Sequence, residues 1–275
     1  MTMLYTVLFW ILAVPGGAEP GSERLQPSAD SSSEASDMKR INGGPYVPLY
    51  RGAFEPPLQD VPTFYLAERP VTNAEFLAFV RANPQWRRSE VKRVFANARY
   101  LANWTGDVQL GPDAPADEAV VYVSWFAARA YAGWKGMRLP TTAEWERAAA
   151  AGRTTPYGHR EAGFREEVLR RYSRGSAGAR ASAGAATGNY WGIYDLHGTV
   201  WEWVEDFNAN LVTGESRNNT DLDRDLFCGS ASLGASDVED YGAFLRFALR
   251  SGLEAAYTGA RLGFRLAADA PIAWN

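Results

Sequence analysis

The sequence predicts a loop-rich fold made of short helices and short strands. Of its 275 residues, 10 are Trp and 26 are Gly, and aromatic residues make up 13% of the chain. Long helical patterns are few, so this composition favours irregular segments anchored by aromatic side chains over a helical bundle or a regular sheet. With 46% hydrophobic and 22% charged residues, the chain can bury the core of one large domain or two small ones.

Charge and residue counts exclude several classes of function. The formal net charge is −4 and the pI is about 5.4, so we expect no nucleic-acid partner, which would call for a basic face. The only cysteine is Cys228, so the sequence cannot form a disulfide within itself. His159 and His197 are the only histidines, too few for a three-histidine metal site.

The N-terminus predicts export. Residues 4–14 form an apolar run much shorter than the roughly 20 residues that span a bilayer, and small residues follow at 15–18. We expect residues 1–18 to be a signal peptide, although no Lys or Arg precedes the run. A disordered or interfacial tail is the alternative. We therefore expect a periplasmic or secreted protein without a transmembrane anchor.

Composition divides the rest of the chain. Residues 19–37 are rich in Ser, Glu, Pro and Gly and have almost no apolar side chains, which is typical of a disordered linker. We expect one folded domain over residues 38–269 and a short tail over 270–275.

Capping signals predict three helices. In each of the tetrads 72–75 and 141–144, a Thr can accept from the backbone while a Glu three residues later reaches back, which is a capping box. Ser124 begins a third helix with apolar residues on one face, and Gly136 ends it.

Shorter patterns complete the assignment. Residues 119–123 have the pattern of a buried strand, and after Gly152 the chain reads as mostly irregular, with a Ser/Ala/Gly-rich loop over 171–188. We expect the remaining short strands within 194–203, 226–232, 244–249 and 262–266.

Four segments carry a family resemblance. They are Arg69–Phe76, then Val123–Trp125 leading to Arg138–Glu146, then Gly192–Trp203, and finally Gly263–Arg265. In this order they resemble the formylglycine-generating enzyme family, also called sulfatase-modifying factors, across essentially the whole expected domain. The resemblance implies an α+β, loop-rich fold with little regular secondary structure, related to C-type lectins.

The third segment implies a metal site. The resemblance assigns one structural calcium ion to the side chains of Asp195 and Glu202 and to the carbonyls of Gly198 and Val200. Oxygen donors of this kind suit Ca²⁺. From the residues alone, we favour a simpler interpretation, in which Asp195 caps a turn and Glu202 pairs with an arginine.

The oxidising members of the family use two cysteines that follow a Gly-Gly-Ser motif. Here Cys228 falls on the first Gly of that motif. Counting forward, the reactive positions fall on Leu233 and Val238, and counting back from Arg250-Ser251 places the second on Gly242. Two thiolates are needed to hold Cu(I). We therefore expect no copper, no catalytic residue of this type, and a packed role for the Cys228 thiol.

An acidic loop replaces the cysteine-bearing loop. Asp237, Glu239 and Asp240 are candidates to line the old substrate groove, with Arg246 and Arg250 behind them. A solvated acidic loop and simple ion pairing are the alternatives.

These observations leave three candidate functions. The first is an exported, non-oxidising accessory or binding protein that acts on a protein partner, for example in a secretion-system regulatory pathway. The second is a periplasmic oxidoreductase of a small molecule such as a siderophore chromophore, as in pyoverdine maturation. The third is a formylglycine-generating oxidase, which the missing cysteines argue against. On balance the sequence favours a protein that is not an enzyme.

Overall fold

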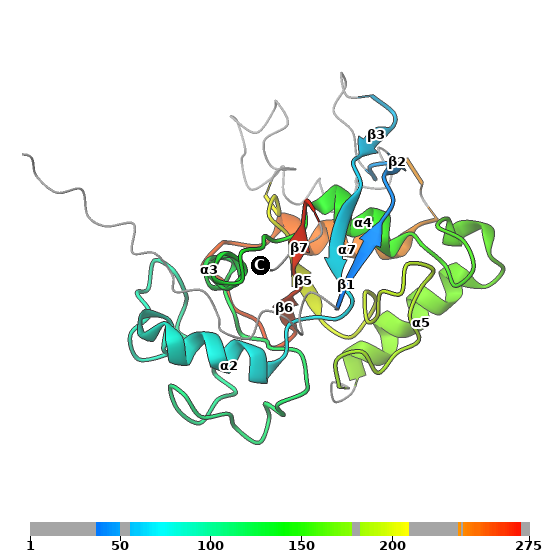
Figure 1. Cartoon of the computed structure of the whole chain (residues 1–275). Helices are drawn as coiled ribbons and strands as arrows, with labels where there is room; N and C mark the ends of the chain where they lie inside the picture. Colours follow the sequence, from blue (N-terminus) through cyan, green and yellow to red (C-terminus); the bar gives the residue numbers. More distant parts are fainter. Residues whose placement is uncertain (1–36, 50–55, 178–181, 209–235, 238, 271–275) are drawn as a thin grey trace, which may run out of the picture.

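The computed structural model describes residues 37–49, 56–177, 182–208, 236–237 and 239–270 (Figure 1). The signal peptide, the strand expected within 226–232, Cys228, Leu233 and Val238 lie outside these residues, as does almost all of the linker and of the C-terminal tail. Within the described residues, no helix combines the length and the apolar character that crossing a bilayer requires.

Three small sheets join segments that are distant in the sequence. Strand β4 (Phe64–Ala67) lies between β1 (Met38–Ile41) and β7 (Ala267–Ala268), and both pairings are antiparallel. Strands β2 (Gly44–Tyr46) and β3 (Gln59–Val61) form an antiparallel pair, and β5 (Trp201–Trp203) and β6 (Leu262–Phe264) a parallel one. The two ends of the described chain therefore share a sheet.

The three capped helices are confirmed. Helix α2 (Asn73–Ala82) begins at Thr72 and α4 (Thr142–Ala149) at Thr141, and both capping boxes are complete. Helix α3 (Trp125–Trp134) begins at Ser124, whose side chain accepts from the backbone of Ala127. Gly136, at φ +68°, lies just beyond its end in the left-handed conformation that glycine tolerates best.

Aromatic side chains form the centre of the core, as the composition predicts. Phe76 and Phe79 of α2 pack against Tyr131 of α3, and Phe264 of β6 makes an edge contact with Tyr131 at 5.4 Å between ring centroids. All four side chains are essentially unexposed. Aromatic pairs at these separations add stability beyond simple burial, so α2, α3 and β6 are held by one cluster.

The strand expected within 244–249 is wrong, because this segment belongs to helix α7 (Tyr241–Ser251). Its buried residues are Gly242, Arg246 and Arg250, four residues apart, which is helical spacing. The near-continuous apolar residues between them suggested a strand, whereas the face that the fold buries is the one with the two arginines.

The loop expected over 171–188 is also partly wrong. Helix α5 (Phe164–Ala177) includes the first seven residues of this expected loop. Glu167 forms an ion pair with Arg171, which lies four residues later. Acidic residues in the first turn and pairs of this spacing stabilise a helix without an apolar pattern. Residues 119–123 are largely buried as expected, but they form only an isolated bridge between Ala119 and Thr72.

The elements divide into two groups around the small sheets. Helices α2 and α3 lie together, while α4 lies beside β2 and β3, and α5 lies next to α7 (Figure 1). The result is an α+β fold with few regular elements, in agreement with the predicted class. Short strands do occur within 194–203 and 262–266, as expected, but each has only three residues, β5 and β6.

Candidate functional site

A cavity of about 760 Å³ lies between helices α4, α5 and α7 and the segment around β2 and β3. Its lining includes all five residues of the candidate groove, namely Asp237, Glu239, Asp240, Arg246 and Arg250. The size lies within the range of cavities that hold small organic ligands.

Helix α4 forms the floor of the cavity and is fixed at both ends. At its start, Thr142 donates from its backbone and its hydroxyl to the Asp206 carboxylate, at 2.6 and 2.9 Å. Near its end, Arg147 donates to the carbonyls of Asn42, Gly43 and Pro45. The Arg147 contacts bind the helix to the β2 segment, which forms one wall of the cavity.

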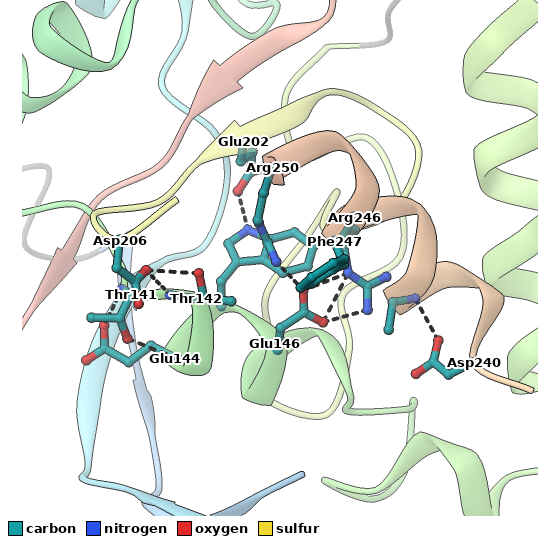
Figure 2. A network of polar contacts seen from close by, with 12 residues as sticks. Thr141, Thr142, Glu144, Glu146, Glu202, Asp206, Asp240, Arg246, Phe247 and Arg250 are labelled. Carbon is teal, nitrogen blue, oxygen red and sulfur yellow. Dashed lines mark hydrogen bonds and ion pairs between the residues drawn. The ribbon is translucent and has the colours of Figure 1, made fainter. Parts of the chain in front are cut away.

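Glu146 on α4 lies between two arginines of α7 (Figure 2). Arg246 binds it through Nε and Nη2, at 2.8 and 2.6 Å, and Arg250 through Nη1 at 2.6 Å. All three residues are at least nine-tenths buried. Both guanidinium groups also lie over the ring of Trp145, at 5.3 and 5.2 Å from its centroid. This buried cluster joins α4 to α7.

The charges in the cluster stabilise one another. Burial alone would raise the pKa of Glu146, but the charges of Arg246 and Arg250 outweigh burial and lower that pKa to about 2. Burial would lower the pKa of Arg246, yet Glu146 holds it well above its usual value. Burial, followed by the charge of Glu146, raises the pKa of the nearby Tyr46 hydroxyl. At neutral pH the cluster therefore has one negative and two positive charges, and Tyr46 is protonated.

A hydrogen-bonded chain leads from the cluster to His197. Arg246 Nη1 donates to the Tyr172 hydroxyl at 3.1 Å, which lies 3.4 Å from His197 Nδ1, and His197 Nε2 lies 3.1 Å from the carbonyl of Ala149. Because Nε2 faces a carbonyl, we assign its proton there, which leaves Nδ1 to accept. Burial first, then the charge of Arg246, lowers the pKa of His197 to about 3, so the ring is neutral.

The entrance has an acidic side and an apolar side. Arg165 of α5 pairs with Asp237 at 2.5 Å and also with Glu239, while Asp240 caps α7 by accepting from the backbone of Ala243. Four of the nine exposed large apolar side chains in the described chain lie around this cavity: Val47, Leu58, Leu169 and Tyr241. Exposed apolar groups gathered at one opening are typical of a binding site.

None of the four residues expected to bind calcium lines the cavity. Asp195, at φ +60°, accepts from the backbone of Gly184 and Ala186, and Glu202 is ion-paired with Arg265. These contacts match the simpler interpretation of both residues. They use one partner on each Asp195 oxygen, and a carboxylate oxygen can accept two.

Asp195 therefore has room to bind a calcium ion, but the other donors have competitors. Arg265 and Trp145 already donate three hydrogen bonds to the Glu202 carboxylate. Arg261 Nη2 lies 3.3 Å from the carbonyl of Gly198 and 3.4 Å from that of Thr199. An ion bound at the Gly198 carbonyl would have to displace this guanidinium. The calcium site stays a prediction, with Asp195, Glu202 and the carbonyls of Gly198 and Val200 as its donors.

The cysteine position that the structure does describe has little room for a larger side chain. Gly242 lines the cavity, and a Cβ atom there would lie 3.0 Å from Val168 Cγ1 and 3.2 Å from Arg246 Nη1. A cysteine at this position would push against the buried cluster.

Sequence reasoning missed the central residue of the site. In the sequence, Glu146, Trp145 and His197 stand out only as members of two family segments, and His197 also as one of two histidines. The available signal was the spacing of Gly242, Arg246 and Arg250, which places two arginines on one helical face. A charged partner for that face had to be sought among residues about 100 positions away.

Comparisons with known proteins agree on the family. A family model described as the sulfatase-modifying factor enzyme 1-like domain matches residues 23–270. The formylglycine-generating enzyme of Bos taurus is 27% identical over 303 residues, covering 94% of this chain and 78% of that protein.

Two further similarities are more limited. A hercynine oxygenase of Mycobacterium tuberculosis is 33% identical over 168 residues, or 53% of this chain. This alignment spans 38% of that protein, so the chain covers less than half of its length. Among solved structures, PvdO from Pseudomonas aeruginosa aligns with a TM-score of 0.45 and 19% identity, over 85% of this chain and 94% of that one.

Proposed function

Because the chain belongs to the sulfatase-modifying factor family, we propose that it is a non-oxidising binding protein whose ligand occupies the cavity between α4 and α7. The observation that carries this proposal is the buried cluster of Glu146, Arg246 and Arg250 at the cavity floor. A buried, charged floor beneath an entrance with an apolar side is the arrangement of a pre-formed binding site.

The metal-ligating side chains of this sequence support the non-oxidising part of the proposal. A copper site with two thiolates needs two cysteines, and the sequence has only Cys228. An iron site with three histidines is equally beyond reach, because His197 is buried in a hydrogen-bonded chain and His159 is the only other histidine. The role in this proposal is therefore recognition, in which a bound ligand is held or presented to a protein partner.

Retention of a ligand tests the proposal. Native mass spectrometry of protein purified from its own host should detect a small molecule that is released on denaturation. Ala243→Phe places a large ring at the cavity lining on α7 and should abolish retention, whereas Ala248→Phe on the exposed face of the same helix should preserve it. Equal retention by both variants would show that the ligand lies elsewhere.

A second candidate is an oxidoreductase of a small molecule, such as a siderophore chromophore. Its support is that the similar proteins include one named as an oxygenase and one named as a formylglycine-generating enzyme. The released molecule distinguishes the candidates. A binding protein returns it with unchanged mass after aerobic incubation, whereas an oxidoreductase returns a product that has lost hydrogen or gained oxygen.

The compartment and the partner belong to the same proposal. The apolar run at residues 4–14 supports export, and N-terminal sequencing of protein from the host should then begin near Glu19. Intact Met1 on cytosolic material would contradict it. Cross-linking in the exported fraction should join the partner to the wild-type protein more strongly than to the Ala243→Phe variant.

A further inference from the structure

Within the described part of the chain, Arg250 uses one of its three guanidinium nitrogens in a hydrogen bond to protein. Its Nη1 donates to Glu146, and within the described part of the chain Nε and Nη2 make no hydrogen bond to protein atoms. Arg246, on the same helix face, is different: its Nε and Nη2 both bind Glu146, and its Nη1 binds Tyr172. The two arginines share one carboxylate, but only Arg250 has two guanidinium nitrogens without a hydrogen bond to the described residues.

The open edge of Arg250 lies in a protected position. The side chain is 7% exposed and lines the cavity. Some polar atoms of the described residues are both inaccessible to solvent and without a hydrogen-bond partner, but Nε and Nη2 of Arg250 are not among them. Because both nitrogens retain some accessible surface, the cavity is the space from which a ligand atom can reach them. A buried guanidinium with unbonded N–H groups is costly unless an acceptor covers it.

The geometry of this edge selects a type of acceptor. The Nε–H and Nη2–H bonds of arginine are parallel and match the two oxygens of a carboxylate, which accept them as a bidentate pair. Arg246 already binds Glu146 in this way. Glu146 balances only one of the two arginine charges, so the cluster retains one net positive charge, which a single carboxylate neutralises.

The entrance defines the rest of the ligand. Val47 and Leu58 are each 52% exposed and Tyr241 is 53% exposed, and all three line the same cavity. A ligand with its carboxylate at the floor would place an adjoining apolar group against these side chains, where burial is favourable.

We propose that the cavity binds a carboxylic acid with an adjacent apolar or aromatic group, and that its carboxylate pairs with Nε and Nη2 of Arg250. The inference rests on the proposed binding function and specifies its ligand class. The carboxylate can belong to a free small molecule or to the C-terminus of a peptide, and the test separates these sources.

Titration calorimetry with matched probes tests the inference on the full chain. The small-molecule pair is 3-phenylpropionate and its neutral amide, and the peptide pair is a pentapeptide ending in Phe with a free or an amidated C-terminus. We expect one or both acids to bind, and the corresponding amide to bind about tenfold more weakly or not at all, because it loses the charge-assisted pair. The acid that binds identifies the source.

Variants localise the effect. Arg250→Lys keeps the charge but removes the parallel N–H pair, so it should weaken acid binding about tenfold and leave amide binding unchanged. Arg129→Gln, which removes an exposed arginine paired with Glu205, is the matched control and should bind like wild type. The comparison of acid and amide in the wild-type protein remains decisive if Arg250→Lys fails to fold.

Two results would overturn the inference. Equal affinity for acid and amide would mean that the cavity does not read a carboxylate, although the binding function would stand if Ala243→Phe still abolished ligand retention. Absence of binding by every acid probe would also reject this ligand class. A different result would contradict the proposed binding function itself: the Ala243→Phe variant would retain its ligand as well as wild type does.

Discussion

Glu202 and Arg265 form an ion pair in which neither side chain is exposed to solvent. Arg265 donates through Nε at 2.7 Å and through Nη2 at 2.8 Å, and Trp145 Nε1 donates to the same carboxylate at 2.7 Å. Glu202 lies on β5 and Arg265 directly follows β6, while Trp145 lies on α4 with its ring against both arginines of the cavity cluster. The parallel strands and the cavity floor therefore share one buried polar network.

Breaking this pair should strongly destabilise the fold. Arg265→Met leaves the Glu202 charge buried without its partner, which typically costs about 3–5 kcal/mol. Urea unfolding monitored by tryptophan fluorescence measures the loss. The control Arg129→Met removes the exposed pair with Glu205 and should cost about 0–1 kcal/mol. Equal losses in the two variants would mean that the buried pair has no special role.

Acid should destabilise the protein through His197. The pKa of His197 in the folded state is lowered to about 3, below its unfolded value of about 6.5, so the unfolded chain binds one more proton between these values. Stability is therefore fully present above pH 6.5 and falls by about 1.4 kcal/mol per pH unit as the pH drops toward 3.

Two histidine variants check this prediction. His197→Gln should flatten the dependence of unfolding free energy on pH between 6.5 and 5, measured by urea unfolding at several pH values. His159→Gln changes an exposed residue at the cavity edge and should keep the wild-type slope. The same slope in both variants would assign the acid sensitivity to other groups.

The chain should not convert a cysteine in a sulfatase-type peptide to formylglycine, with or without added copper. The physical reason is that a two-thiolate copper site needs a second cysteine, and the sequence has only Cys228. Mass spectrometry of the peptide after incubation measures conversion, with a two-cysteine formylglycine-generating enzyme as the positive control. Conversion that Cys228→Ser abolishes would reverse this conclusion.

Calcium remains a proposal with a specific structural consequence. An ion at Asp195 and Glu202 would displace Arg261 from the carbonyls of Gly198 and Thr199, so Arg261→Gln should bind calcium more tightly than wild type. At free calcium about 100-fold above the dissociation constant, binding stabilises the folded state by about 2.7 kcal/mol. EGTA should then lower the melting temperature by several degrees, and Asp195→Ala should abolish the response.

Metal analysis completes that test. If purified wild-type protein and Arg261→Gln both contain no calcium and melt at the same temperature with and without EGTA, the site does not exist. Asp195 would then act only as the acceptor for the Gly184 and Ala186 backbone, and Glu202 only as the partner of Arg265.

Local chemistry in the sequence determined where three helices begin. Thr72, Ser124 and Thr141 each satisfy backbone donors within three residues, so no distant contact is needed to recognise them. The aromatic and glycine content likewise indicated a loop-rich fold, and four short segments were enough to predict the family.

Only the tertiary structure decided the character of the cavity. Helix α7 buries Arg246 and Arg250, whose N–H groups are costly to bury without an acceptor, and here a carboxylate supplies one for both arginines. That carboxylate, Glu146, lies about 100 residues earlier on a helix whose own signals are confined to its first turn. Because such pairing depends on how α4 and α7 pack, the sequence alone showed five charged residues near a loop, whereas the fold joined them to Glu146 in one cavity.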